Sequence, residues 1–223
     1  MRRRRRRRRN PPPTVIRSGG PRLRPLAAIV ALPRRSPLHP QLARGLAAAD
    51  RWHLLRSDLA PVPVRATATT RQSGCYRWRE GDPVDLRVSR LHGRIALSFL
   101  HELGHFVDHQ LGSGLGQSWA SGAHEAFEPW RAAAAALPSR AAPASGRSHR
   151  RYFDSAREVW ARSYAQTVLA RSSDPVLQAE LATLQAAEDA FVWSAVELDP
   201  VADAIEDVLA RLGLLRRALA VAV

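Results

Sequence analysis

The sequence predicts an α+β fold, in which a small antiparallel three-stranded sheet precedes a long helix and a helical C-terminal half. Three short segments rich in β-branched or alternating apolar residues, at 64–70, 74–79 and 84–88, predict the strands. Residues 91–111 carry apolar side chains nearly all round a helix, so this helix should be largely buried. Strands that come before helices along the chain are typical of α+β folds.

Further helices are expected along the chain both before the three strands and after the long helix. Apolar residues at helical spacing predict a helix over residues 40–59, and Pro61 follows it. Gly112 is expected to end the long helix. The C-terminal half contains four more predicted helices, at residues 123–137, 153–170, 175–192 and 200–215.

Charge separates an N-terminal tail from the rest of the chain. All 34 basic residues are Arg, and 20 acidic residues leave a formal charge of +14. Residues 1–35 hold 13 of the Arg and no acid, whereas the rest holds 21 Arg and 20 acids and is near neutral. We therefore expect a disordered Arg- and Pro-rich tail at 1–36 and one domain over 37–223. This balance does not describe a basic nucleic-acid-binding domain, and contact with nucleic acid would fall to the tail alone.

Cysteine content and hydropathy exclude further classes of protein. A single cysteine, Cys75, excludes a disulfide within the chain and a zinc site built from cysteines. No apolar run reaches the roughly 18 residues of a membrane span. Residues 26–32 have the apolar character of a signal-peptide core, but Pro33 and Arg34 follow where small residues should stand. We expect a cytoplasmic protein without a membrane span.

The chemistry of the chain is carried by an HExxH motif, His101-Glu102-Leu103-Gly104-His105. Residues four apart on a helix lie one above the other, so both imidazoles can point at one zinc ion. Glu102 projects from the same turn and can take a proton from the attacking water. Two histidines and a glutamate in a buried helix need partners, because unpaired polar groups there cost free energy.

The same helix does not supply the third ligand. His109 continues the series of fours, but eight residues of helix rise about 12 Å, too far for one ion. Asp108 lies one turn past His105. It could accept the outer N–H of that imidazole, or it could be a surface residue at the end of the helix.

Two glutamates in later segments are candidates for the third ligand. Glu125 lies twenty residues beyond His105, a spacing found in thermolysin-like enzymes, and Glu158 lies fifty-three residues beyond it. Glu158 also fits a capping box with Ser155, in which it would close the start of a helix. Spacing alone leaves the two candidates equal.

The segments HELGHFVDH and YFDSAREVWARSYAQ together resemble a family of zinc metallopeptidase-like domains of phage and mobile-element proteins, related to the catalytic domain of anthrax lethal factor. The resemblance covers about residues 70–215 and implies a zincin-like fold. It implies that His101, His105 and Glu158 bind Zn²⁺ and that Glu102 is the general base. Tyr152 would then face the developing oxyanion. No acid follows Glu158 by four residues, a departure from the family.

Two functions follow from these features. The first is a zinc-dependent metallopeptidase acting on a protein or peptide, whose extended substrate could pair with the strand at residues 84–88. The second is a catalytically inactive binding module of the same fold, whose Arg-rich tail contacts nucleic acid or a partner. The sequence indicates neither the substrate nor the oligomeric state.

Overall fold

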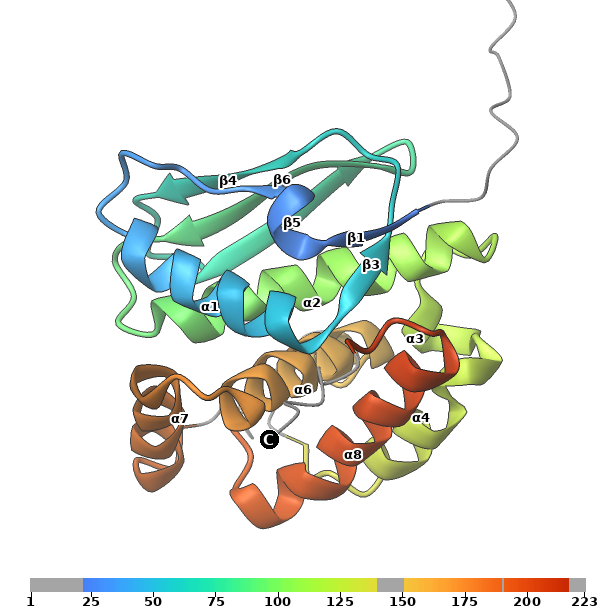
Figure 1. Cartoon of the computed structure of the whole chain (residues 1–223). Helices are drawn as coiled ribbons and strands as arrows, with labels where there is room; N and C mark the ends of the chain where they lie inside the picture. Colours follow the sequence, from blue (N-terminus) through green and yellow to red (C-terminus); the bar gives the residue numbers. More distant parts are fainter. Residues whose placement is uncertain (1–21, 140–150, 190, 217–223) are drawn as a thin grey trace, which may run out of the picture.

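The computed structural model describes residues 22–139, 151–189 and 191–216, and their α+β class agrees with the prediction (Figure 1). Residues 1–21, which include the Arg run, lie outside the described part. A mixed sheet covers one side of the molecule, helices lie directly beneath it, and further helices form another layer (Figure 1). Among the described helices, none is both long and apolar enough to cross a membrane.

The main sheet has four strands in the order β2-β4-β6-β5. Their bounds are Val30–Ala31 for β2, Val62–Thr67 for β4, Gly74–Arg79 for β5 and Asp82–Ser89 for β6. The predicted antiparallel three-stranded sheet is wrong in one pairing. β5 and β6 form an antiparallel hairpin, but β6 lies beside β4 and runs parallel to it. After β4 the chain crosses to the far edge of the sheet and forms β5, and β6 then returns between β4 and β5. Local sequence does not encode this order.

The N-terminal boundary of the domain lies earlier than predicted. Strand β1, Leu23–Pro25, pairs with β3, Leu54–Arg56, and β2 joins the main sheet. The short helix η1, Leu26–Ala28, lies between β1 and β2, and Leu26 and Ile29 are fully buried. The described part of the predicted tail, residues 22–36, is therefore part of the domain, because its apolar residues complete the core.

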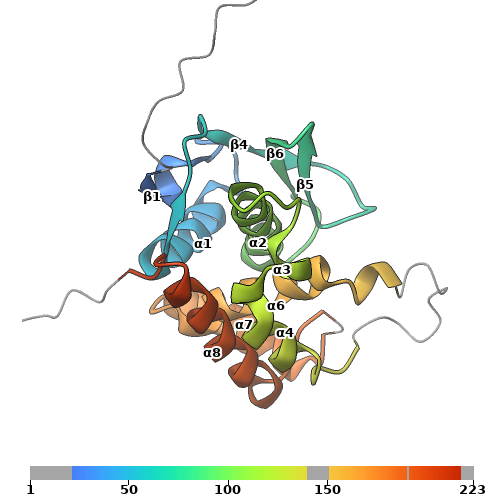
Figure 2. The same ribbon diagram turned by 90° about the vertical axis from the view of Figure 1, so that its right-hand side faces the viewer.

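Helix α2, Ile95–Gly114, is the centre of the fold. It lies beside α1, His39–Trp52, and contacts β5 and β6 on one side and α6, Ala156–Arg171, on the other (Figures 1 and 2). The other helical segments are α3 (Ala120–Ala123), η2 (Glu125–Phe127), α4 (Glu128–Ala134), α7 (Pro175–Ala186) and α8 (Ala195–Arg211).

Several predicted helix bounds need correction. The helix predicted over 40–59 ends at Trp52, because the chain turns extended at His53 and continues as β3. Gly112 does not end α2. A Cβ there would lie 2.8 Å from the backbone nitrogens of Trp119 and Ala120, so this glycine permits close packing instead. The predicted helix 123–137 is split into α3, η2 and α4, and α8 starts at a Ser194 capping box instead of at Pro200.

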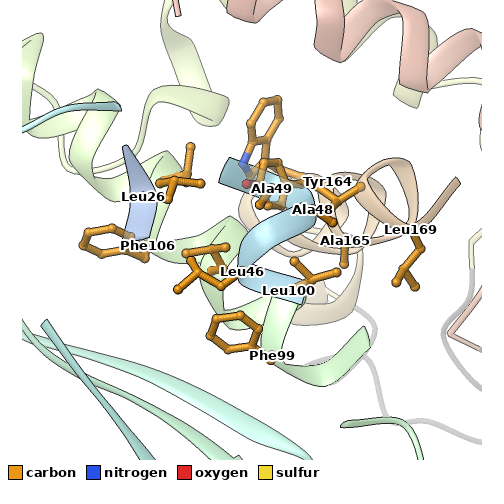
Figure 3. Packing of buried hydrophobic residues seen from close by; sticks show 14 of the residues in the cluster. Leu26, Leu46, Ala48, Ala49, Phe99, Leu100, Phe106, Tyr164, Ala165 and Leu169 are labelled. Carbon is orange, nitrogen blue, oxygen red and sulfur yellow. The ribbon is translucent and has the colours of Figure 1, made fainter. Parts of the chain in front are cut away.

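The core is continuous across the helical layers. Side chains of α1, α2 and α6, including Leu46, Phe99 and Leu169, converge between these three helices (Figure 3). The same cluster extends to Val64 and Leu86 on the inner face of the sheet. Burial of this apolar surface is the main force that holds the layers together.

Gly104 lies where α2 and α6 approach each other most tightly. A Cβ at this position would meet the Cα atom of Ala161 at 3.0 Å and Cδ1 of Tyr164 at 3.1 Å. The indole Nε1 of Trp160 donates a hydrogen bond to the carbonyl oxygen of Gly104 at 3.2 Å. The glycine in the middle of HELGH is therefore required by packing, and the hydrogen bond fixes how far one helix can slide along the other.

Gly104→Ala is expected to lower the free energy of unfolding by about 1–3 kcal/mol, because the added methyl group forces α2 and α6 apart. This loss outweighs the gain of about 1 kcal/mol that alanine brings in helix propensity. The measurement is urea unfolding followed by circular dichroism. Gly114→Ala is the matched control, since nothing lies within 4 Å of its Cβ. Equal stability of Gly104→Ala and the parent protein would contradict the packing argument.

His53 joins the end of α1 to α6 and to the C-terminal end of the described chain. It is fully buried, its Nδ1 lies 2.9 Å from the Leu54 carbonyl oxygen, and its Nε2 lies 2.7 Å from the Tyr164 hydroxyl. A carbonyl can only accept, so Nδ1 carries the proton and Nε2 accepts from the tyrosine. His53 also forms an isolated antiparallel bridge with Leu215. Burial lowers the pKa of His53 to about 4.

This depressed pKa predicts a loss of stability in acid. His53 is neutral in the fold, whereas in the unfolded chain it has the ordinary histidine pKa of about 6.5. This difference in pKa stabilises the folded state, and its full contribution is present above about pH 6.5. That stability declines as the pH falls toward 4. The destabilisation caused by His53→Gln should therefore be about 1.4 kcal/mol smaller at pH 5.5 than at pH 7.5. Urea unfolding of both proteins at the two pH values measures this difference. A destabilisation independent of pH would show that the pKa of His53 is the same in the fold as in the unfolded chain.

Candidate metal centre

Helices α2 and α6 bring together three side chains that are far apart in the sequence. His101 and His105 project from the middle of α2, and Glu158 projects from the first turn of α6. The two Nε2 atoms lie 3.1 Å apart. Glu158 Oε1 lies 3.3 Å from His105 Nε2, and Glu158 Oε2 lies 3.5 Å from His101 Nε2. One ligand atom from each residue can therefore be chosen so that all three lie within 4.8 Å of one another.

These separations fit a tetrahedral metal ion. Two ligands bonded at about 2.0–2.1 Å to a tetrahedral ion lie roughly 3.3–3.4 Å from each other. The distance between the two imidazole nitrogens, 3.1 Å, and the distance from each of them to its nearer Glu158 oxygen, 3.3 and 3.5 Å, are close to that value. Two imidazole nitrogens and one carboxylate oxygen are also the donor atoms that zinc accepts. His101, His105 and Glu158 could thus hold a zinc ion and leave its fourth position open.

The charges of the three groups depend on one another. Burial opposes charge on His101, but the Glu158 hydrogen bond and the negative charge of Glu102 outweigh it and raise the pKa of His101. Burial lowers the pKa of His105 to about 4, so this imidazole is neutral. Burial alone would raise the pKa of Glu158, yet its hydrogen bonds to the two histidines hold that pKa well below its usual range. An anionic carboxylate beside a neutral imidazole suits a cation.

The capping-box alternative for Glu158 is wrong. Ser155 is the N-cap residue of α6, but its side chain makes no capping hydrogen bond. Its Oγ is buried without a hydrogen-bond partner in the described part of the chain. Ser194 and Glu197 at the start of α8 form a complete capping box, in contrast to Ser155 and Glu158 at the start of α6. The Glu158 carboxylate turns instead to the histidines on α2.

Glu102 lies on the side of α2 that faces strand β5. It is 5% exposed, and the backbone N–H of Tyr76 donates a hydrogen bond to its carboxylate. A Cβ on Gly74 would lie 2.5 Å from Glu102 Oε1, so only glycine lets the strand come this close. Burial raises the pKa of Glu102 to about 7, although the charge of His101 opposes that rise. The structure therefore places this carboxylate beside the histidine pair, held by β5.

The alternative ligand Glu125 and the other candidate residues of α2 do not belong to this cluster. Glu125 is exposed in η2 and does not belong to the cluster. Asp108 is fully buried, but it accepts hydrogen bonds from the backbone and hydroxyl of Ser121 at 2.7 and 2.6 Å. It does not support His105, whose Nδ1 has no hydrogen-bond partner among the described residues. His109 is a buried core residue, and its Nδ1 lies 2.7 Å from the Tyr76 hydroxyl.

The cluster opens into a cavity of about 540 Å³. Tyr152 lines it, is half exposed, and lies close enough to Glu158 for the carboxylate to act on its hydroxyl. Burial and the Glu158 carboxylate both raise the pKa of Tyr152, so its hydroxyl keeps its proton. The predicted Tyr152 thus lies beside the histidines and Glu158. The opposite wall includes strand β5, from Gly74 to Trp78.

Sequence reasoning missed three features of this site. The contact of Gly74 and the Tyr76 N–H with Glu102 depends on which strand lies beside α2, which local patterns do not reveal. Trp119 lines the cavity from the loop after α2, with its ring 6.0 Å from that of His105. Arg157 also lines the cavity, and its only sequence signal is its position next to Glu158.

Comparisons of the chain with protein-family models, curated proteins and solved structures find no match. The resemblance to lethal-factor-related domains therefore rests on the two sequence motifs alone. The proposed function therefore depends on the geometry of the site.

Proposed function

We propose that this protein is a zinc-dependent metallopeptidase that hydrolyses peptide bonds, with His101, His105 and Glu158 as ligands. The observation that carries the proposal is the convergence of these three donors at separations of 3.1 to 3.5 Å, with Glu102 beside them in one cavity. Few structural roles need two imidazoles and a carboxylate at such distances. A site with three protein ligands also leaves a position for water, as catalytic zinc sites require.

A bound zinc ion supplies two things here: it lowers the pKa of water, and it polarises the carbonyl of the substrate. The chain's own residues move the proton. Glu102 removes a proton from water as the water oxygen forms a bond to the carbonyl carbon. Glu102 then gives that proton to the leaving amine when the carbon–nitrogen bond breaks. The Tyr76 N–H and the close backbone at Gly74 keep the carboxylate in place for both transfers.

Tyr152 is suited to the charge that develops on the attacked carbonyl oxygen. Its hydroxyl is protonated and lies beside Glu158 at the cavity wall. A hydroxyl in this place can donate a hydrogen bond to an oxyanion, and such donors contribute much of the rate enhancement in acyl transfer.

Strand β5 supports an extended peptide as the substrate. It is the edge strand of the main sheet and borders the cavity. An extended chain can add to such an edge through main-chain hydrogen bonds. Strand β6, which contains residues 84–88, is interior to the sheet, so the expectation that the substrate pairs there is wrong.

The alternative function, an inactive module that binds through its Arg-rich tail, rests on residues 2–9. These residues lie outside the described part of the chain, and no contact in the described part favours this alternative.

Metal analysis tests the ligand set. The full chain should bind about one zinc per molecule, as a structural or catalytic site does. Glu158→Ala should lose most of this zinc, whereas Glu125→Ala, which removes an exposed carboxylate outside the cluster, should keep it. Inductively coupled plasma mass spectrometry after reconstitution and desalting gives both values. Zinc retained in Glu158→Ala and lost in Glu125→Ala would move the site to Glu125, and no zinc in the parent chain would exclude the centre.

Glu102→Gln tests the chemistry. It should reduce kcat/KM on a cleaved peptide by about 10²- to 10⁴-fold, because glutamine cannot take a proton, and it should leave zinc content unchanged. The readout is cleavage of an internally quenched peptide library by the zinc-loaded protein. Glu125→Gln serves as the control and should cleave at the parent rate. A Glu102→Gln protein as active as the parent would exclude Glu102 as the general base.

A further inference from the structure

Arg157 lies in the cavity wall immediately beside the metal centre. It is the second residue of α6, one position before Glu158. Its guanidinium carbon lies 5.2 Å from the centre of the Tyr152 ring and 5.7 Å from that of the Trp119 ring. All three side chains line the cavity. The two aromatic rings thus hold the guanidinium on the Trp119 side of the histidine pair.

The positive charge of Arg157 has no acidic partner in the described part of the chain. Three other arginines line the cavity. Arg94 forms an ion pair with Asp189, and Arg162 donates hydrogen bonds to main-chain carbonyl oxygens of Phe153 and Glu158. Arg71 is exposed to solvent, whereas Arg157 lies over the two aromatic rings beside the histidine pair and forms no ion pair among the described residues. Two carboxylates are close enough to interact with the charge of Arg157, but that of Glu158 is turned to the two histidines and that of Asp108 accepts hydrogen bonds from Ser121.

The place of Arg157 in its helix is also unfavourable for a cation. The first turn of a helix carries the positive end of the helix dipole, which disfavours Lys and Arg and favours anions. The aromatic rings accommodate the guanidinium but do not neutralise its charge. A residue that opposes a local rule in this way is often functional.

We propose that Arg157 binds a carboxylate of the peptide substrate, and so selects substrates with a negative charge close to the cleaved bond. This inference rests on the proposed peptidase function. Aromatic rings use none of the N–H donors of a guanidinium as a carboxylate does, so a carboxylate can still accept two hydrogen bonds from it at once. The carboxylate can belong to an Asp or Glu side chain or to the C-terminus of the peptide. Both have the chemistry that Arg157 recognises.

Binding is tested first, without any need for catalysis. The indole N–H signal of Trp119, assigned with Trp119→Phe, is followed by ¹⁵N nuclear magnetic resonance in the full zinc-loaded chain. The probes are N-acetylglutamic acid amide, N-acetylalanine with a free carboxylate, and neutral N-acetylglutamine amide. At least one anionic probe should bind about tenfold or more tightly than the neutral probe, since hydrogen bonds to charged groups are strong. The anionic probe that does so identifies the source of the carboxylate.

Variants assign this preference to Arg157. Arg157→Gln should abolish the difference between anionic and neutral probes, and Arg157→Lys should keep part of it. Arg51→Leu, an exposed residue on α1 away from the cavity, should keep all of it. Thermal unfolding checks that each variant is folded. Equal binding of all three probes to the parent chain, or an anionic preference that persists in folded Arg157→Gln, would overturn the proposal.

Cleavage separates this inference from the proposed function. On an internally quenched peptide, exchange of Glu for Gln at the selected position, or of a free C-terminus for an amide, should lower kcat/KM about tenfold or more in the parent. The exchange should change little in Arg157→Gln. If no peptide is cleaved but the probes bind in an Arg157-dependent way, the peptidase function fails and the carboxylate site stands. If peptides are cleaved without regard to charge, the peptidase function stands and the carboxylate site fails.

Discussion

The close crossing of α2 and α6 at Gly104 is the contact on which the site depends. His101 and His105 flank this glycine on α2, and Glu158 precedes its neighbour Ala161 by less than one turn on α6. With any larger residue at 104, the helices would stand further apart, and a carboxylate from α6 would not reach both imidazoles. The Trp160 hydrogen bond to the Gly104 carbonyl oxygen adds a longitudinal restraint. Backbone packing thus sets the size of the gap between the three ligands.

The polar residues of α2 are accommodated by one neighbouring element each. Glu102 faces β5, Asp108 is held by Ser121, and His109 meets Tyr76. In a helix buried on nearly every side, each such group needs a partner, because an unpaired polar group there is costly. These partners also fix the rotation of α2 about its own axis, since a turn of the helix would break several hydrogen bonds together. The helix therefore presents the histidine pair to α6 and the glutamate to the sheet.

Sequence patterns correctly predicted features that depend on neighbouring residues. They failed for features that depend on how distant segments of the chain pack together. Helical spacing placed His101 and His105 on one face and excluded His109, and both conclusions agree with the structure. Spacing did not choose between Glu125 and Glu158, because the choice depends on how α6 docks on α2. The parallel pairing of β4 with β6 and the inclusion of residues 22–36 in the fold escaped prediction for the same reason. Composition marks residues 22–36 as Arg- and Pro-rich, yet two fully buried residues, Leu26 and Ile29, attach them to the core. The expected role of Asp108 failed because its partner, Ser121, lies in α3, whose position beside α2 the sequence does not give.

The bridge between His53 and Leu215 has a consequence for the synthesis of the chain. Leu54 donates a backbone hydrogen bond to Leu214, and Arg216 donates one to Trp52, so the last described residues close over the end of α1. A ribosome delivers the N-terminal half first. The sheet, α1 and α2 can assemble on emergence, but the surroundings of His53 stay open to water until residue 216 has left the exit tunnel. A nascent chain that stops short of this point leaves a core histidine and its tyrosine partner accessible to chaperones and proteases.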